Sequence, residues 1–245
     1  MLFRSPELAR KINAIAPGIM AEEAKRLGAV FMTYSTDYVF DGSKQGPYTE
    51  LDKPNPLSIY GRTKAEGDAA VQTVGGSYFI FRTSWVFGAR GKNFFLTMLK
   101  LLQQRESLQI VDDQVGAPTW SRSIAEATAQ IIAQKVDSTR SPSRPAFAEK
   151  FADIAGIYNM TCRDKTSWYG FTEWIAERLA ASGKTQLAKL RPISSKEYPL
   201  PAKRPINSSL DNHKLLATFG IQLPTWKQAA GLVFEEVEQS RGTER

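Results

Sequence analysis

The stretch "AVFMTYSTDYVFDG", residues 29–42, opens as an almost continuous apolar run and closes on polar residues and an Asp-Gly turn. Such a run is typical of a strand that is covered on both faces in a parallel sheet. Ser35, Thr36 and Asp37 then stand at the carboxyl end of the predicted strand. A buried hydroxyl or carboxylate without a partner costs about 1–3 kcal/mol. This segment therefore either caps the strand as a loop or points into a cleft that binds a ligand.

Helical and strand-like segments follow each other on both sides of this stretch. A helical repeat of apolar residues covers residues 6–27, with a kink expected at Pro17-Gly18, and residues 41–57 have the composition of a loop. Residues 58–74 predict a helix that Asn55 or Ser58 can start, and residues 77–88 predict a second buried strand. Strand, loop, helix and strand in this order form a βαβ unit. The fold class is therefore α/β, with a parallel sheet and helices on both sides.

The rest of the chain continues this alternation and suggests a division into regions. Further helices are expected over residues 93–104, 124–134, 166–182 and 225–239, a strand and turn over 108–118, and a strand over 156–161. We predict a Rossmann-like region over 1–135, with elements of a substrate-binding region interleaved from about residue 93. The polar, proline-broken residues 136–150 predict a surface loop, and residues 151–245 mainly a smaller C-terminal α/β region for substrate binding.

Composition excludes several classes of protein. No apolar run is long enough to span a membrane, and the N-terminal residues lack the apolar core of a signal peptide. Cys162 is the only cysteine, which excludes an intramolecular disulfide and fits a reducing cytoplasm, and with a single histidine, His213, a transition-metal site is not expected. We expect His213 to be solvated on a helix. The net charge of +7 is spread along the chain, which favours a basic surface or a small phosphorylated ligand over nucleic acid.

The motif "YGRTK" carries the candidate chemistry. Tyr60 and Lys64 lie four residues apart, so on a helix they share one face. A phenol has a pKa of about 10, and a neighbouring cation lowers that pKa because it favours the phenolate. Ligands bind beyond the carboxyl ends of parallel strands. Thr36 could therefore donate a hydrogen bond to a carbonyl oxygen that Tyr60 protonates.

Several linked motifs carry a resemblance to a known family. The segments "STDYVFDG", "PYTELDKPNPLSIYGRTKAEGDAAV", "FRTSWVFG", "NFFLTML", "DDQVGAPT" and "RPINSSL" occur in the order seen in dTDP-4-dehydrorhamnose reductases. These are extended short-chain dehydrogenase/reductases that reduce the C4 keto group of dTDP-4-dehydro-L-rhamnose with NADPH or NADH. The similarity runs from about Pro6 to the C-terminus. It implies a nucleotide-sugar substrate.

The resemblance implies roles for particular residues. Thr36, Tyr60 and Lys64 match the catalytic triad, in which the lysine also hydrogen-bonds the nicotinamide ribose, and Tyr34 matches a cofactor-contacting position. Thr36 with Asp37 would contact the sugar, and Trp85 matches a tryptophan that packs over the substrate. Arg204 and residues 114–119 lie where the family builds its nucleotide-sugar pocket. Some members use Mg²⁺ at a dimer contact, which implies a possible homodimer, although no carboxylates can be matched to that ion.

One feature of the family is missing from these residues. Members open with a strand and a Gly-x-x-Gly-x-x-Gly turn whose amides receive the cofactor pyrophosphate, and no such spacing occurs in the 245 residues. We therefore expect a shortened reductase with an incomplete sheet and impaired cofactor binding. Two alternatives are a non-catalytic subunit similar to the regulatory β subunit of methionine adenosyltransferase, and a related nucleotide-sugar reductase or epimerase.

Overall fold

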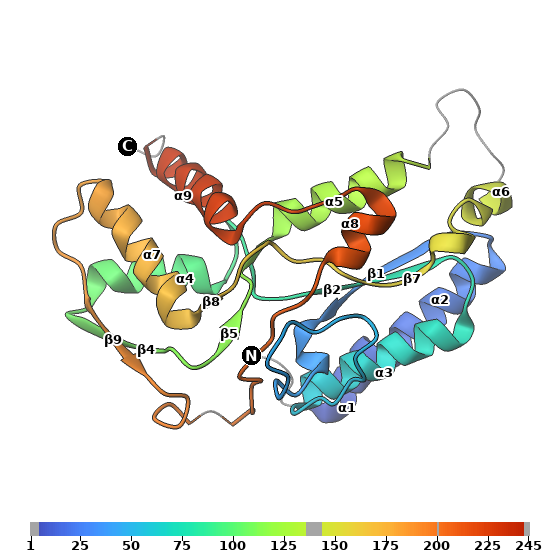
Figure 1. Cartoon of the computed structure of the whole chain (residues 1–245), viewed down its shortest axis with the longest axis horizontal. Coiled ribbons are helices and arrows are strands. Elements are labelled where there is room, and N and C mark those ends of the chain that lie inside the picture. The colour runs from blue at the N-terminus through green and yellow to red at the C-terminus, as the bar shows by residue number, and fades with distance from the viewer. Residues whose placement is uncertain (1–4, 136–143, 200, 243–245) are drawn as a thin grey trace.

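A three-stranded parallel sheet forms the centre of the larger lobe (Figure 1). The computed structural model describes residues 5–135, 144–199 and 201–242. Strands β1 (Phe31–Thr36), β2 (Tyr78–Thr83) and β7 (Gly156–Asn159) lie in the order β1-β2-β7 and pair in parallel. Helix α3 (Ile59–Val74) connects β1 to β2. The predicted βαβ unit and the α/β fold class are thus confirmed.

Helices cover both faces of this sheet. On one face, Ile80 of β2 packs with Val71 of α3 and Ala21 of α2 (Ala16–Arg26). On the other face, Phe79 and Phe81 pack with residues of α5 (Ser121–Ala133) and α8 (His213–Phe219). Successive strand residues point to opposite faces, so Phe79, Ile80 and Phe81 of β2 are all apolar because both faces are covered.

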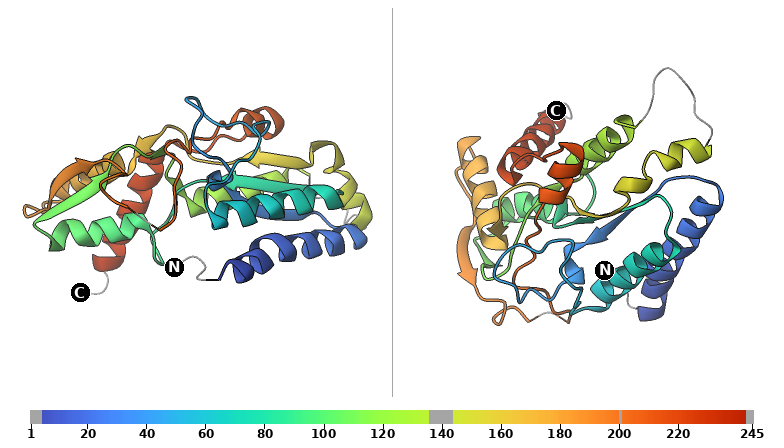
Figure 2. Two further views of the ribbon diagram at one scale, coloured as in Figure 1. Left: turned by 90° about the horizontal axis from the view of Figure 1, so that it is seen from below. Right: turned by 45° about the vertical axis from the view of Figure 1, so that its right-hand side comes forward.

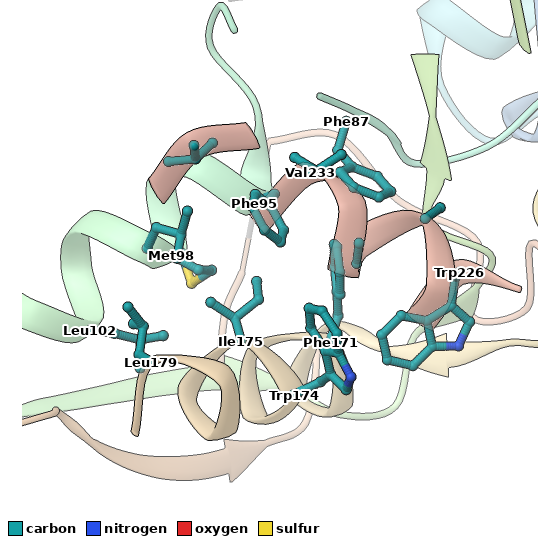
Figure 3. Close-up of a cluster of buried hydrophobic side chains, with 14 of the residues drawn as sticks. Phe87, Phe95, Met98, Leu102, Phe171, Trp174, Ile175, Leu179, Trp226 and Val233 are labelled. Carbon is teal, nitrogen blue, oxygen red and sulfur yellow. The ribbon is translucent and has the colours of Figure 1, made fainter. Parts of the chain in front are cut away.

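A second lobe contains the remaining long helices (Figure 1). Strands β4 (Ser107–Val111) and β9 (Lys189–Ile193) form a parallel pair beside α4 (Phe94–Gln104), α7 (Trp168–Ala181) and α9 (Trp226–Gly242). Figure 3 shows the core between these helices, where Phe95 and Met98 of α4 face Phe171 and Ile175 of α7. Both lobes contain elements from before and after residue 150, so the proposed domain limits remain a prediction.

Short strand pairs connect the two lobes. Strand β3 (Val86–Phe87) runs parallel to β6 (Thr119–Trp120), and β5 (Val115–Gly116) runs antiparallel to β8 (Thr166–Ser167). The buried strand predicted over residues 77–88 is therefore confirmed for Tyr78–Thr83, whereas its continuation to residue 88 as one strand is wrong. The chain leaves β2 at Ser84 and Trp85, and Trp85 has φ of 46°, which no regular strand accommodates.

The first helical segment departs from regular α-helix just before its proline. Helix α1 (Pro6–Arg10) passes into a π-helical turn, Lys11–Ile15, and then into α2. At ordinary α-helical spacing the Pro17 ring would clash with the Asn13 carbonyl, and Pro17 has no N–H to donate to it. The wider π turn relieves that conflict. The kink was expected at Pro17-Gly18, and the structure places the irregular turn at Lys11–Ile15, which ends two residues before Pro17.

The loop predicted over residues 136–150 is only partly within the described residues. Residues 136–143 lie outside them, and residues 144–149 form helix α6 (Arg144–Glu149), so the loop prediction is wrong for that part. Its last residues precede Phe151, which is fully buried against Phe79. That packing anchors the end of the segment to the sheet.

Candidate active site

Polar side chains converge where β1 and β2 end. Thr36 pairs in register with Thr83, and Ser35, Thr36, Asp37 and Thr83 are all buried. Thr36 Oγ1 accepts from the Tyr38 amide at 3.2 Å, which starts a 3-10 turn over Asp37–Val39. Thr36 thus caps this turn, which is the first of the two roles that the sequence allowed for this segment. Within the described part of the chain, however, Asp37 Oδ2 and Thr83 Oγ1 have no hydrogen-bond partner, which is typical of a site that binds a polar ligand.

Asp37 is the carboxyl of this group, and it is almost completely buried. Burial raises its pKa from 3.8 to about 7, against the opposing effect of the nearby Ser208 and Thr36 hydroxyls. Thr36 Oγ1 donates to Asp37 Oδ1 at 2.9 Å. A carboxyl with a pKa near 7 can hold a proton at neutral pH and donate it in a hydrogen bond.

Helix α3 brings Tyr60 to the same edge of the sheet. Ser58 is the N-cap residue, and its Oγ accepts from the Gly61 amide at 3.1 Å. Gly61 is needed because a Cβ at this position would lie 2.0 Å from the Tyr38 carbonyl oxygen. The glycine of "YGRTK" therefore lets the turn after Asp37 rest directly on the start of α3, next to Tyr60.

Tyr60 is a half-buried phenol with polar and aromatic neighbours. Burial raises its pKa above 10, the nearby Thr36 hydroxyl opposes that effect, and the charges of Asp37 and Asp68 add to it. The Tyr38 ring meets the Tyr60 ring edge to face, with centroids 6.2 Å apart. The structure thus brings Thr36 and Tyr60 together, as the sequence predicted. It does not show the expected lowering of the pKa of Tyr60, because burial outweighs the favourable effects.

Lys64 lies one turn along α3 and reaches back to the strand. Its Nζ donates to the Tyr34 carbonyl at 2.6 Å, so it links α3 to β1. Burial lowers the pKa of Lys64, while nearby Asp68 raises it. The Tyr34 side chain has a separate contact, because its hydroxyl lies 2.9 Å from Thr128 Oγ1 of α5. Lys64 and Tyr34 are therefore neighbours through the backbone of β1.

A buried ion pair behind Lys64 was missed from the sequence. Arg82 Nε donates to Asp68 Oδ2 at 3.2 Å, and both side chains are almost completely buried. The Arg82 guanidinium also lies 5.2 Å from the centroid of Phe40. Asp68 occupies the same helical face as Tyr60 and Lys64, four residues further on. That spacing is the one sequence signal that could have suggested it.

Trp85 lies beside the polar cluster and stacks on a second tryptophan. Its ring is parallel to that of Trp168, with centroids 3.5 Å apart and planes 4° apart. A positive φ in a bulky residue costs about 1–3 kcal/mol, so the surrounding packing must hold Trp85 in this conformation. A Cβ on Gly116 would approach both the Trp85 ring and Ser208 Oγ, at 2.6 and 2.7 Å. Contacts thus run from Asp37 through Ser208 and Gly116 to Trp85.

Two further predicted segments lie next to each other. The Val115 amide donates to the Ile206 carbonyl at 2.7 Å, and the Ser208 amide donates to the Val115 carbonyl at 2.8 Å. The segment 114–119 is thereby joined to the segment that follows Arg204. Arg204 is exposed, and its charge acts on the nearby Tyr38 hydroxyl, whose pKa burial raises to about 12. This places Arg204 on the Tyr38 side of the cluster.

Other expectations concern metals, membranes and His213. Residues 5–135, 144–199 and 201–242 contain no group of three or more metal-ligating side chains. Over the same residues, no helix is long and apolar enough to cross a lipid bilayer. His213 begins α8 and its side chain is 90% exposed, with Nδ1 2.8 Å from Asp211 Oδ1. The solvated position predicted for it is confirmed.

Comparison with known proteins gives consistent matches over nearly the whole chain. Residues 4–239 match the family model of the RmlD substrate binding domain. A dTDP-4-dehydrorhamnose reductase of Burkholderia thailandensis is 46% identical over 232 residues, which cover 94% of this chain and 75% of the relative.

Solved structures show the same likeness. The crystal structure of a dTDP-4-dehydrorhamnose reductase from Clostridium acetobutylicum superposes with a TM-score of 0.82 and 36% identity, covering 95% of this chain and 75% of that one. A reductase of the same name from Bacillus anthracis, solved in complex with NADP, gives a TM-score of 0.80 and 29% identity over 95% and 75% of the two chains. The parallel sheet and the flanking helices described above are common to these structures.

Proposed function

From the premise that this chain belongs to the RmlD substrate binding domain family, as a dTDP-4-dehydrorhamnose reductase, we propose that the cluster around Thr36, Asp37 and Tyr60 is its catalytic site. The reaction is reduction of the C4 keto group of dTDP-4-dehydro-L-rhamnose to give dTDP-L-rhamnose, and the enzyme is an NAD(P)H-dependent oxidoreductase. The observation that supports the site assignment is the packing of Tyr60 against the turn that holds the buried Thr36 and Asp37, where Asp37 Oδ2 has no hydrogen-bond partner.

The donor groups near Tyr60 suit one end of a nicotinamide cofactor. The Lys64 ammonium and the Tyr60 hydroxyl lie on one face of α3, where they can hydrogen-bond a ribose. The 245 residues contain no Gly-x-x-Gly-x-x-Gly segment for the pyrophosphate. When bound, NADPH or NADH supplies the hydride that reduces C4. Tyr34 and Lys64 are the residues that we propose hold its nicotinamide-ribose end.

Tyr60 is the group that we propose donates the proton. Because burial raises its pKa above 10, the phenol keeps its proton at neutral pH and is available as an acid. Thr36 Oγ lies beside the phenol and can orient the carbonyl oxygen toward it. As negative charge develops on that oxygen, the proton passes from Tyr60 Oη to the C4 oxygen, and Lys64 favours the resulting phenolate.

Asp37, Trp85 and Arg204 supply contacts for the rest of the substrate in this proposal. The Asp37 oxygen that lacks a protein partner can bond a sugar hydroxyl, either as acceptor or, when protonated, as donor. Trp85 offers an apolar face, and Arg204 offers a positive charge for the diphosphate. The segments 114–119 and 206–208, which are hydrogen-bonded to each other, lie next to Trp85 through Gly116.

Substitution of Tyr60 by Phe tests this assignment. In the chain joined to a glycine-loop segment of the family, we expect kcat to fall at least about a hundredfold with little change in dTDP-L-rhamnose affinity, because general acid catalysis is worth about 10²–10⁴. Loss of NADPH absorbance measures kcat, and calorimetry measures affinity. Tyr78→Phe is the matched control, because Tyr78 begins β2 at the opposite end of the strand from the site. A Tyr60→Phe chain that keeps more than about a third of kcat would contradict the assignment.

We further propose that the enzyme is cytoplasmic. Cys162, the only cysteine, is buried, and burial raises the pKa of its thiol to about 11, so it is unreactive and suits a reducing compartment.

We also propose that the enzyme distinguishes dTDP-sugars from UDP-sugars. Titration with dTDP and UDP compares the two nucleotides directly. Tighter binding of UDP would favour the related nucleotide-sugar reductases or epimerases instead.

A further inference from the structure

A series of four aromatic rings joins the core of the second lobe to the candidate active site. Trp168 packs face to face on Trp85, and its ring also meets Phe94 at a centroid distance of 4.5 Å. Phe94 in turn stacks at 5.9 Å on Phe171, whose place among the core residues is shown in Figure 3. Trp85 is therefore the end of an aromatic series that begins in the buried core.

The backbone around Trp168 is fixed independently of Trp85. Ser167 caps helix α7 by accepting from the Gly170 amide at 2.9 Å, and its hydroxyl donates to Asp112. Ser167 also pairs with Val115, while Thr166 pairs with Gly116. The two-residue pairing of β5 with β8 thus brings Gly116 of β5 near Trp168, which directly follows β8, and both of them contact Trp85.

Trp85, by contrast, has little regular structure of its own. It lies in the two-residue link between β2 and β3, is half-buried, and has φ of 46°. Its carbonyl accepts from the Thr119 amide at 3.2 Å, but this bond fixes only the backbone. The orientation of the indole depends on the ring beneath it and on the closeness of Gly116.

We propose that Trp168 is a positioning residue, which holds the Trp85 indole as one wall of the sugar site without touching the substrate itself. The proposal rests on the proposed function, because it takes Trp85 to contact the sugar. It assigns Gly116 a matching part: only a residue without a side chain leaves room for the indole at this place. Loss of the stack would then weaken recognition of the sugar and leave recognition of the nucleotide unchanged.

Circular dichroism tests the stack without any ligand. Two stacked indoles whose in-plane transition dipoles are rotated relative to each other give an exciton couplet that belongs to the pair, so Trp85→Phe and Trp168→Phe should each remove the same signal. The double variant should lose no further couplet. Trp174→Phe is the control, because Trp174 lies on the same helix and packs on Trp226 rather than on Trp85. Different difference spectra for the two single variants would overturn the proposal.

Calorimetry tests the consequence for binding by comparing dTDP with dTDP-L-rhamnose. We expect Trp168→Ala to weaken dTDP-L-rhamnose binding at least about tenfold and to leave dTDP binding within about twofold, while Trp168→Phe restores most of the loss because a phenyl ring still stacks. Gly116→Ala should produce the same sugar-dependent loss by displacing the indole from the other contact.

The two proposals fail in different ways. Equal losses for dTDP and dTDP-L-rhamnose, or no loss for either, would overturn the positioning role of Trp168. A wild-type chain that binds neither ligand would instead count against the proposed function. In that case the couplet still decides whether Trp168 holds the indole of Trp85.

Discussion

Asp37 and Asp41 stand four residues apart in one turn, yet their surroundings move their pKa values in opposite directions. Burial raises the pKa of Asp37 to about 7. Asp41 accepts from the Ser43 amide and hydroxyl, from Asn55 and from Tyr48, and these bonds hold its pKa well below 3.8. Asp41 therefore organises the loop over residues 41–57, whereas Asp37 is left to meet a ligand.

The stability of the fold should depend on pH differently through these two carboxyls. The raised pKa of Asp37 means that its contribution is complete below about pH 4 and is lost as the pH rises through 7. Asp37→Asn removes that pH-dependent loss of stability, because the Asn side chain does not ionise. We expect the unfolding free energy of this variant, relative to wild type, to rise by up to about 4 kcal/mol between about pH 4 and pH 8. Urea unfolding at the two pH values measures the difference.

Asp41→Asn is the matched control with the opposite sign. A lowered pKa contributes stability that is present above about pH 4 and lost as the pH falls through the folded value. We therefore expect Asp41→Asn to be destabilised at about pH 8 and to approach wild type in acid. The same pH trend in both variants would contradict the assigned environments.

At the scale of elements, the crossing of α3 with the first helical segment depends on one glycine. A Cβ on Gly67 would lie 2.0 Å from the Asn13 carbonyl oxygen of the π-helical turn. Asn13 Nδ2 also donates to Thr63 Oγ1 at 3.0 Å, one turn earlier on α3. The wider π turn before Pro17 and the missing side chain at Gly67 together allow these helices to touch through their backbones. Because α3 carries Tyr60 and Lys64, this contact helps to set the site.

Two Gly→Ala substitutions in helices should therefore change stability in opposite directions. Gly67→Ala is expected to destabilise the protein by about 1–3 kcal/mol, because overpacking outweighs the gain in helix propensity. Gly231→Ala in α9 meets nothing within 4 Å and should stabilise by up to about 1 kcal/mol. Thermal unfolding of both variants measures the two effects. A stabilised Gly67→Ala chain would show that the helices do not cross as described.

At the scale of the whole molecule, an apolar face remains uncovered. Leu8, Ile12 and Ile19 are each more than half exposed on the N-terminal helical segment, with Ile15 beside them. Figure 2 shows this segment along the outer margin of the larger lobe. Strand β1 is also at the edge of its sheet. Exposed apolar patches and open strand edges both favour association with another chain.

We expect the 245-residue chain to self-associate through this face. Substitution of Ile12 and Ile19 by Lys should shift sedimentation toward the monomer without lowering the melting temperature, because both side chains are exposed in the monomer. Leu232→Lys is the control, since Leu232 is 52% exposed on α9. Self-association that is insensitive to the double substitution, or that Leu232→Lys removes, would place the interface elsewhere. The same measurement determines whether the homodimer expected from the resemblance forms.

Ligand binding to the 245-residue chain should be unequal. The groups proposed for the nucleotide sugar are present, whereas the sequence has no glycine-rich loop to receive the pyrophosphate of NADPH. We expect dTDP to bind measurably and NADPH to bind more weakly than in the micromolar range, so that turnover by this chain alone is slow. Calorimetric titration with each ligand gives the comparison. Micromolar NADPH binding would show that Lys64, Tyr34 and their neighbours suffice.

The sequence by itself determined the local elements and the central chemistry. The apolar run before Ser35, the helix that carries Tyr60 and the second buried strand are local patterns, and their order specifies a parallel βαβ unit. Neighbouring residues alone also limited the helix start to Asn55 or Ser58, of which the structure has Ser58, and predicted the exposure of His213. Linked motifs then pointed to the family.

Only the tertiary structure decided which distant residues complete the site, because those contacts have no local signature. The pairing of β4 with the unpredicted strand β9 joins residues about 80 positions apart, and the stacking of Trp168 on Trp85 joins residues of similar separation. The direction of the pKa shift at Tyr60 likewise depends on burial by the whole fold, whereas the Lys64 cation that the i, i+4 spacing suggested donates to the Tyr34 carbonyl. Spacing along a helix fixes which side chains share a face, whereas burial and long-range packing fix what those side chains can do.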